Sequence, residues 1–374
     1  MPTATPHVAL NTAAIDAIVQ QTYAGSWGVE LGIYENGVPL YEQGYGLRDR
    51  GLPDTFVSRP NFWGLPQPDK TFAFARGAFA PDANTVFNMA SVSKEFTAAA
   101  ILLLQQDGKV SLNDTVSKYF PTFPRGNEIT LLDAMQHRSG LVDYVDRFVT
   151  QAPEFAPAYQ TFMASGQTDL SATVTQLATY PLNFAPGTQF EYSNSNYLLL
   201  SLIVAQVSGE SLGAFLQQRI FGPLGMTQTH VGDYGPQPGG DIALGYRDEG
   251  SGPVRTWQWN LQWLAGPGGL TSTVRDMEKW DRAVRAPGIF TQATLTQMFA
   301  PSPIAAPYGA YAAGWVISTL NGHPYVWHDG AIGGFQTMNA LFPDLGIDIV
   351  ILTNDGTGKD PYYIIPQILG LVTN

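Results

Sequence analysis

Strand-forming segments lie near the two ends of this chain, and this distribution is the strongest constraint on its fold. Near the N-terminus, GVELGIY (28–34) and VPLYEQGYG (38–46) flank Asn36-Gly37, a residue pair typical of two-residue hairpin turns. Near the C-terminus, turn signals at Asn321-Gly322 and Asp344-Leu345-Gly346 separate apolar segments: AAGWVISTL (312–320), HPYVW (323–327), GFQTMNALF (334–342) and IDIVILTN (347–354). We expect two strands from the first region and three from the second, forming an antiparallel five-stranded sheet.

Helical patterns occupy most of the sequence between these regions and also both ends. Apolar residues recur at helical spacing in 95–106, 196–208 and 275–285. Residues 11–22, with Asn11 as the N-cap, and the tail 360–372 predict terminal helices, and Pro366 predicts a kink in the tail. The pattern predicts an α/β (α+β) fold with a discontinuous sheet domain, residues 1–86 and 266–374, and a mainly helical domain, residues 87–265, with the active site between them.

Composition excludes several classes of function. A net charge of −12 argues against nucleic acid and anionic membrane surfaces as partners, and the absence of cysteine excludes disulfides and thiolate chemistry. No apolar run is long enough to span a membrane, and no signal peptide is visible at the N-terminus. We therefore expect a soluble protein, periplasmic or secreted if an export signal was removed and cytoplasmic otherwise. Residues 52–87, rich in proline and aromatic side chains, predict a long ordered loop.

The residues Ser91-Val92-Ser93-Lys94 begin an apolar run that ends at Asp107-Gly108, which indicates a helix starting near Ser91. Because Ser91 and Lys94 are three residues apart, they share a helix face, and the amine is expected to reach the hydroxyl and accept its proton. Partial burial would lower the pKa of Lys94 toward that task. By itself, a serine and a lysine at this spacing is a weak signal.

Two further motifs follow in a fixed order: Tyr192-Ser193-Asn194, and His328-Asp329-Gly330 on a predicted strand. With these motifs the chain resembles the serine β-lactamase and penicillin-binding-protein superfamily, over about residues 27–355. The resemblance is greatest to its class C branch, which includes class C β-lactamases, DD-peptidases and D-aminopeptidases with an H-x-G motif, and family VIII carboxylesterases. It implies a β-lactamase/transpeptidase-like fold.

The resemblance implies a role for each motif residue. Ser91 would be the nucleophile, Lys94 its base, and Tyr192 the phenol that relays a proton to the leaving group and activates the deacylating water. Asn194 would position Lys94 and the substrate carbonyl, and the backbone N–H groups of Ser91 and Ala331 would form the oxyanion hole. Gly330 would let the substrate backbone approach, and His328 would contact substrate. Because histidine is at most partly charged at neutral pH, we expect weak capture of a β-lactam carboxylate.

The sequence leaves several functions open. We expect a hydrolase without metal or cofactor that acts on a small ester, an amide or a short peptide, either as a carboxylesterase or as a D-amino-acid peptidase or amidase. An acyltransferase, a weak β-lactamase and a non-catalytic penicillin-binding sensor are the alternatives. The oligomeric state is not indicated.

Three other features of the sequence have simpler interpretations. Gly209-Glu210-Ser211-Leu212-Gly213 matches a hydrolase nucleophile elbow, but helical sequence precedes it, and a helix–helix turn capped by Ser211 is the simpler prediction. His137 is expected to be a structural residue near a helix end. Arg275, Asp276, Glu278 and Lys279 are expected to be charges on a solvated helix face.

Overall fold

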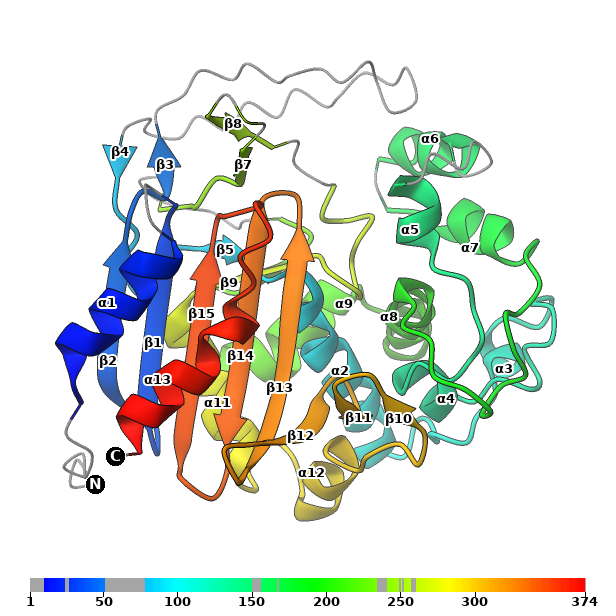
Figure 1. Ribbon diagram of the computed structural model, residues 1–374. Coiled ribbons are helices and arrows are strands. Elements are labelled where there is room, and N and C mark those ends of the chain that lie inside the picture. The colour runs from blue at the N-terminus through cyan, green and yellow to red at the C-terminus, as the bar shows by residue number, and fades with distance from the viewer. Residues whose placement is uncertain are drawn as a thin grey trace.

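The computed structural model describes residues 10–23, 27–50, 78–149, 156–166, 168–233, 241–248, 250, 252–256 and 260–373. Its centre is an antiparallel sheet of eight strands in the order β10-β11-β12-β13-β14-β15-β1-β2 (Figure 1). The strands are β1 (Val29–Glu35), β2 (Val38–Tyr45), β10 (Ala305–Ala306), β11 (Gly309–Tyr311), β12 (Val316–Leu320), β13 (His323–Ile332), β14 (Phe335–Phe342) and β15 (Ile347–Thr353). The combination of helices with one antiparallel sheet is the α/β (α+β) class that was predicted.

The prediction of five strands was wrong. Each of the four C-terminal apolar segments forms its own strand, and β10 and β11 extend the sheet beyond them. These two strands have only two and three residues, so they are too short to show the alternation that identifies a strand in sequence. The turns were predicted correctly: Asn36, Gly37, Asn321 and Gly322 all adopt the positive φ angles that a tight hairpin of this kind requires.

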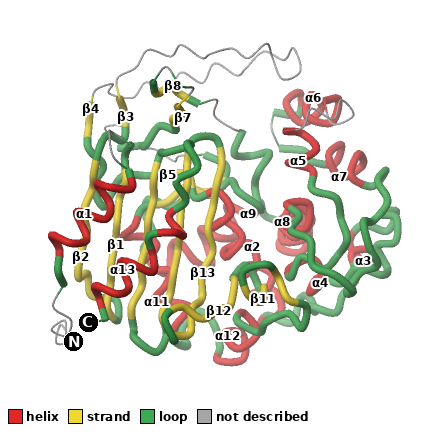
Figure 2. Tube along the Cα trace, viewed as in Figure 1, coloured by secondary structure: helices red, strands yellow, loops and turns green. Residues whose placement is uncertain are grey.

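Both faces of the sheet are covered by helices, and the side chains of β15 show how. Ile347, Ile349 and Ile351 pack with Ile15 of α1 (Thr12–Thr22) and Ile365 of α13 (Ile365–Val372). The alternate residues Val350 and Leu352 belong to the hydrophobic core on the opposite face. Figure 2 shows α1 and α13 in front of the strands and α11 (Val274–Arg285) behind them.

Both terminal helices are present as predicted, but the C-terminal α-helix begins only at Ile365, so Pro366 lies at its start rather than at a kink within it. The Asn11 side chain accepts a hydrogen bond from the backbone N–H of Ala14 and so caps α1. Pro366 lies in the first turn of α13, directly after the short 3-10 helix Pro361–Tyr363, where its missing N–H leaves no helical hydrogen bond unmade.

The remaining helices lie beside and behind the sheet (Figure 1). They are α2 (Ser93–Gln106), α3 (Val116–Tyr119), α4 (Leu131–Met135), α5 (Tyr144–Val149), α6 (Ala156–Ala164), α7 (Ser171–Leu177), α8 (Asn194–Ser208), α9 (Leu212–Leu216), a π-helix (Gln217–Phe221), α10 (Gly222–Leu224) and α12 (Gln292–Met298). The helices predicted at 95–106, 196–208 and 275–285 are α2, α8 and α11. Ser211 caps α9 through a hydrogen bond from the Ala214 N–H, which confirms the simpler prediction for that segment. The division into two domains stays a prediction.

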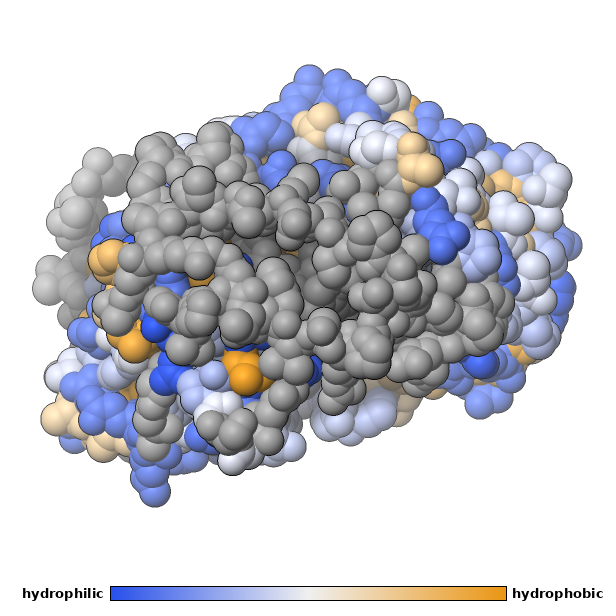
Figure 3. Space-filling view, turned by 90° about the horizontal axis from the view of Figure 1, so that it is seen from above, coloured by the Kyte–Doolittle hydropathy of each residue, from blue (hydrophilic) through white to orange (hydrophobic). Residues whose placement is uncertain are grey.

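Short strand pairs complete the described structure: β3 (Asp49–Arg50) with β4 (Ala78–Phe79), β7 (Tyr246–Asp248) with β8 (Pro253–Arg255), and β9 (Leu270–Ser272) between β5 (Phe87–Asn88) and β6 (His230–Val231). Most of the predicted loop at 52–87 lies outside the described residues. Seen from above, the described surface is mainly hydrophilic, with isolated hydrophobic residues (Figure 3). No single described helix has both the length and the apolar character needed to cross a membrane, although α8 and Leu212–Leu224, bent by 72° at their junction, meet that test as a pair.

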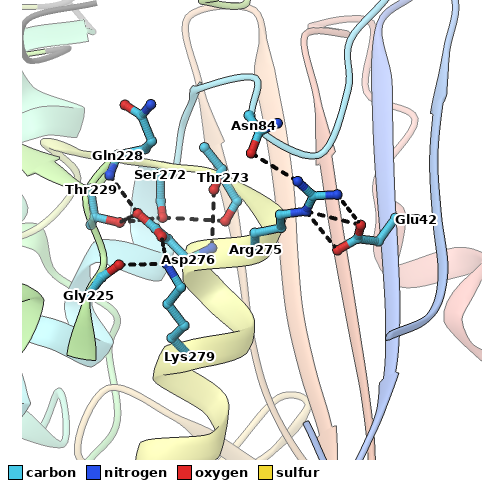
Figure 4. A network of polar contacts seen from close by, with 10 residues as sticks. All are labelled: Glu42, Asn84, Gly225, Gln228, Thr229, Ser272, Thr273, Arg275, Asp276 and Lys279. Atoms are coloured by element: carbon cyan, nitrogen blue, oxygen red, sulfur yellow. Dashed lines mark hydrogen bonds and ion pairs between the residues drawn. The ribbon is translucent and has the colours of Figure 1, made fainter. Parts of the chain in front are cut away.

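The charged residues at the start of α11 are not all solvated, which corrects the prediction for this segment (Figure 4). The Asp276 side chain is only 3% exposed and accepts hydrogen bonds from the Gln228 N–H at 2.8 Å, the Thr229 hydroxyl at 2.9 Å and the Lys279 ammonium at 2.8 Å. Arg275 does lie at the surface, where it pairs with Glu42 of β2. Asp276 therefore fixes α11 to the 228–229 segment, a long-range contact that helical spacing alone does not indicate.

Replacing Asp276 with alanine should lower the free energy of unfolding by about 2 kcal/mol, because the buried donors of Gln228 and Thr229 lose their acceptor. Replacing the neighbouring Arg275 with alanine, which removes an exposed ion pair, should change it by less than about 1 kcal/mol. Urea denaturation of both variants measures the difference. Equal destabilisation by the two changes would contradict the role assigned to Asp276.

Candidate active site

Ser91 lies in a strained turn between β5 and α2, in the short 3-10 helix Ala90–Val92. Ala90 has φ +45°, an unusual value for a residue with a side chain, and its N–H donates to the Asn88 side chain at 2.7 Å. The Ser91 hydroxyl is thus held at the N-terminal end of α2. Ser91 is partly exposed and lines a pocket, whereas the following residues of α2 are buried.

The Lys94 amine reaches the Ser91 hydroxyl, as predicted. Its Nζ donates to Ser91 Oγ at 3.0 Å, to Asn194 Oδ1 at 2.8 Å and to the carbonyl oxygen of Pro267 at 2.8 Å. Lys94 is fully buried, and this burial lowers its pKa to about 7, while the nearby Asp143 opposes the shift. A substantial fraction of the amine is therefore neutral at pH 7 and able to accept a proton.

Tyr192 and Asn194 reach the same point from the start of α8. The Tyr192 hydroxyl is hydrogen-bonded to the Ser91 side chain, and Lys94 Nζ lies 4.7 Å from the centre of the Tyr192 ring. Burial raises the pKa of Tyr192 well above its usual value, so the phenol keeps its proton at neutral pH. Lys94 therefore contacts three other predicted site residues, Ser91, Tyr192 and Asn194, and Tyr192 also contacts Ser91.

The segment 265–273 holds the start of α2 in place from the other side. The Ser93 hydroxyl accepts a hydrogen bond from the Leu270 N–H at 3.0 Å, and Thr97 donates to the Gly266 carbonyl at 2.8 Å. Together with the bond from Lys94 to Pro267, these contacts fix the first two turns of α2. The geometry between Ser91 and Lys94 is consequently supported by a separate part of the chain.

Asp143 orients Asn194, a contact that was not predicted. One carboxylate oxygen of Asp143 accepts both the backbone N–H and the side-chain N–H of Asn194, each at 2.8 Å, and the other oxygen accepts from the Val145 N–H at 2.7 Å. Because the Asn194 amide donates to Asp143, its oxygen is left to accept from Lys94. The sequence signal was an aspartate directly before a helix, which indicates an N-cap but does not reveal the partner 51 residues away.

His137 lies just after the end of α4, as predicted, and it also lies beneath Tyr192. Its ring stacks on the Tyr192 ring with 4.3 Å between centres, and its Nδ1 accepts the Ser193 N–H at 3.0 Å. Burial, with Lys94 nearby, lowers the pKa of His137 well below its usual value, so the imidazole is neutral. His137 therefore supports the Tyr192-Ser193 backbone and ring without itself contacting Ser91.

The third motif forms one wall of the pocket through Asp329, Gly330 and Ala331 of β13. A methyl group on Gly330 would lie 2.6 Å from the Met89 carbonyl oxygen, so only glycine allows β13 to approach the Ser91 turn this closely. Ser91 and Ala331, whose N–H groups are the predicted oxyanion donors, both line the pocket.

His328 does not line the pocket, although it was predicted to contact substrate. Its side chain is 2% exposed, its Nε2 is 2.8 Å from the Tyr311 hydroxyl, and its Nδ1 is 2.5 Å from the carbonyl oxygen of Asp329. Burial, with Lys94 nearby, lowers the pKa of His328 to about 3. Both ring nitrogens therefore have protein partners, and the ring is neutral.

The pocket next to Ser91 has a volume of about 370 Å³, which suits a small acyl donor. Its described lining combines polar groups around Ser91 with the apolar side chains of Val145, Leu264, Pro267 and Ile332. The Ser91 hydroxyl and Gly330 of β13 therefore meet at a single cavity, and the Lys94 amine lies 3.0 Å from that hydroxyl. This arrangement can support formation of a covalent acyl-serine.

Known proteins are similar to this chain in sequence and in structure. The chain is 30% identical over 279 residues to Protein flp of Staphylococcus aureus (strain COL), covering 72% of this chain and 53% of that protein. It is 29% identical over 323 residues to Unguisins hydrolase ungD' of Aspergillus campestris, covering 81% of this chain and 56% of that protein. This chain thus spans little more than half the length of these curated relatives.

Solved structures show the same fold. The D-amino acid amidase from Ochrobactrum anthropi SV3, complexed with D-phenylalanine, superimposes with a TM-score of 0.76 at 24% identity, covering 97% of this chain and 99% of that chain. The octameric penicillin-binding protein homologue from Pyrococcus abyssi gives a TM-score of 0.75 at 23% identity, covering 97% and 77%. The model of the Beta-lactamase family matches residues 15–370. The chain therefore belongs to the Beta-lactamase family.

Proposed function

We propose that this protein is a serine hydrolase that cleaves small esters or amides through an acyl-enzyme on Ser91. The observation that carries the proposal is the 3.0 Å contact between Lys94 Nζ and Ser91 Oγ, with a buried amine whose pKa is about 7. A neutral amine at that distance is a suitable general base for a serine hydroxyl. The names of a hydrolase relative and an amidase of the same fold are consistent with it.

In the first half of the reaction, Ser91 Oγ attacks the substrate carbonyl carbon as its proton passes to Lys94 Nζ. The carbonyl oxygen becomes an oxyanion and accepts hydrogen bonds from the Ser91 and Ala331 N–H groups. Tyr192, which keeps its phenolic proton at rest, gives that proton to the leaving group as the carbonyl–leaving-group bond breaks. The proton held by Lys94 then restores the phenol.

In the second half, water replaces the leaving group and attacks the acyl carbon. A proton of the water passes through the Tyr192 hydroxyl to the neutral Lys94 amine. Lys94 then gives this proton to Ser91 Oγ as the acyl–oxygen bond breaks, so that Ser91 leaves as the free hydroxyl. Asn194, oriented by Asp143, keeps Lys94 aligned during both transfers. Tyr192 and Lys94 therefore exchange a proton in each half-reaction and should titrate as a unit.

Mass spectrometry of the protein after incubation with a fluorophosphonate tests the proposal directly. We expect one adduct per chain, mapped to the peptide containing Ser91, and no adduct in Ser91→Ala. Ser211→Ala is the matched control because Ser211 lies in the other serine motif and caps a helix; that variant should label like the unmodified protein. Labelling that persists in Ser91→Ala or disappears in Ser211→Ala would place the nucleophile elsewhere.

A further inference from the structure

The described lining of the pocket carries negative charge only. Its two ionisable acids are Asp146 of α5 and Asp329 of β13, and the described residues that line it include no lysine, arginine or histidine. A carboxylate on the substrate would therefore meet like charge, whereas a cationic group would meet opposite charge. The electrostatics of the pocket distinguish substrates by the charge of their substituents.

Two basic residues close to the pocket, His328 and Lys94, do not reverse this sign. His328 is buried, its ring nitrogens are both occupied by protein partners, and the ring is neutral. Lys94 is fully buried beneath Ser91, and in the proposed mechanism it is the neutral amine that starts the reaction. When Lys94 is neutral and the site can react, neither His328 nor Lys94 therefore supplies a positive charge that opposes the acids lining the pocket.

Asp329 is placed to contact a substituent close to the reacting carbonyl. It follows the buried His328 on β13 and lines the pocket, and one of its carboxylate oxygens lies 3.7 Å from Nδ1 of the neutral His328 ring. Its side chain is 43% exposed. It precedes Ala331 by two residues, a separation of about 7 Å along a strand, and the Ala331 N–H is the proposed oxyanion donor.

The ionisation of Asp329 is compatible with this contact. Burial of part of the carboxyl group, with the negative charge of Asp360 nearby, raises the pKa of Asp329 to about 6, while Lys94 acts in the opposite direction. Most of the Asp329 side chains therefore carry a negative charge at pH 7.

We infer that the acyl donor carries a protonated amine near its reacting carbonyl and that Asp329 binds this amine. The inference rests on the proposed function, since it concerns the acyl group that Ser91 receives. Asp329 is then a specificity-determining residue, and the second acid, Asp146, adds to the negative potential that attracts the amine. The same arrangement disfavours acyl donors with a carboxylate, which include β-lactams.

Three methyl esters that differ only at the α-carbon test the inference: alanine methyl ester in both enantiomers, methyl isobutyrate, and monomethyl methylmalonate. They place an ammonium, a methyl group or a carboxylate at the same position. We expect kcat/KM to fall in that order for the unmodified protein, with the better alanine enantiomer exceeding methyl isobutyrate. Asp329→Asn should reduce the ratio of alanine ester to isobutyrate by about tenfold, the effect of losing one charge-assisted hydrogen bond.

Asp344→Asn is the matched control, because it removes the same charge at the opposite end of β14, where Asp344 pairs with His323; it should leave the ratio unchanged. An unchanged ratio in Asp329→Asn, or a preference of the unmodified protein for the carboxylate ester, would overturn the inference while leaving Ser91-dependent turnover intact. Turnover that persists fully in Ser91→Ala would instead overturn the proposed function, so the two failures are distinguishable.

Discussion

Replacing Lys94 with methionine should lower kcat/KM for a methyl ester by about three orders of magnitude. Methionine is of similar length and has no basic group, so the Ser91 hydroxyl loses the amine 3.0 Å away that accepts its proton. Loss of a positioned general base typically lowers the rate by about 10²–10⁴-fold. Steady-state hydrolysis measured at pH 8, where most of the amine is neutral in the unmodified protein, gives the comparison.

The pH profile identifies the reason for the loss. Only the neutral amine accepts a proton, and the pKa of Lys94 is about 7, so kcat/KM of the unmodified protein should rise as the pH increases through about 7 and then level off. Lys94→Met should lack this rise. Lys118→Met removes an exposed lysine of α3 that pairs with Asp114. This variant should keep both the rate and the pH profile of the unmodified protein. A flat profile in the unmodified protein, or a loss smaller than tenfold in Lys94→Met, would contradict the role of Lys94 as base.

The contact between Ser91 and Lys94 and the hairpin turns of the sheet were predictable because each rests on a short-range signal. Ser91 and Lys94 meet through helix geometry alone, and the turns at Asn36-Gly37 and Asn321-Gly322 follow from the φ angles that asparagine and glycine tolerate. The approach of Tyr192 to Ser91, 101 residues away in the chain, followed only from the resemblance of the ordered motifs to a known family. No local pattern at Tyr192 indicates that contact.

The features that sequence reasoning missed depend on long-range packing. The position of Asp143 directly before α5 indicates a helix cap, and one of its oxygens does accept the Val145 N–H. Its other oxygen accepts from Asn194, because α5 and α8 begin side by side. Asp276 lies in a run of charges typical of a solvated face, and it is buried because the 228–229 segment covers it. His328 occupies its expected strand, yet its ring bonds to Tyr311 of β11, a strand too short to predict. In each case the sequence placed the residue correctly in its local element but did not indicate which distant residue it contacts.

Replacing Tyr192 with phenylalanine should lower kcat for methyl esters by about two orders of magnitude, and the size of the effect should depend on the leaving group. Methoxide is a poor leaving group and needs the phenolic proton as the bond breaks, whereas p-nitrophenolate leaves without one. Phenylalanine keeps the ring that stacks on His137 and lies beside Lys94, so the variant removes only the hydroxyl that bonds to Ser91. We therefore expect a smaller loss in the acylation rate with p-nitrophenyl acetate.

Deacylation gives a second signature of the same hydroxyl. If Tyr192 also activates the water that attacks the acyl-enzyme, Tyr192→Phe should acylate readily with p-nitrophenyl acetate and then stall. Stopped-flow absorbance should show a burst of p-nitrophenolate equal to the enzyme concentration, followed by a slow steady state. Mass spectrometry of the stalled protein should find one acetyl group on Ser91.

Tyr197→Phe is the appropriate control for this variant, because Tyr197 is a buried tyrosine at the start of α8, only five residues after Tyr192. Its ring centre is 5.6 Å from Lys94 Nζ, and its hydroxyl donates to the Met135 carbonyl at 2.8 Å rather than to Ser91. Removing that hydroxyl should lower stability modestly and should produce neither a burst nor a dependence on the leaving group. Equal losses for methyl and p-nitrophenyl esters in Tyr192→Phe, without a burst, would mean that the Tyr192 hydroxyl positions Ser91 but transfers no proton, and the relay would have to pass through Lys94 alone.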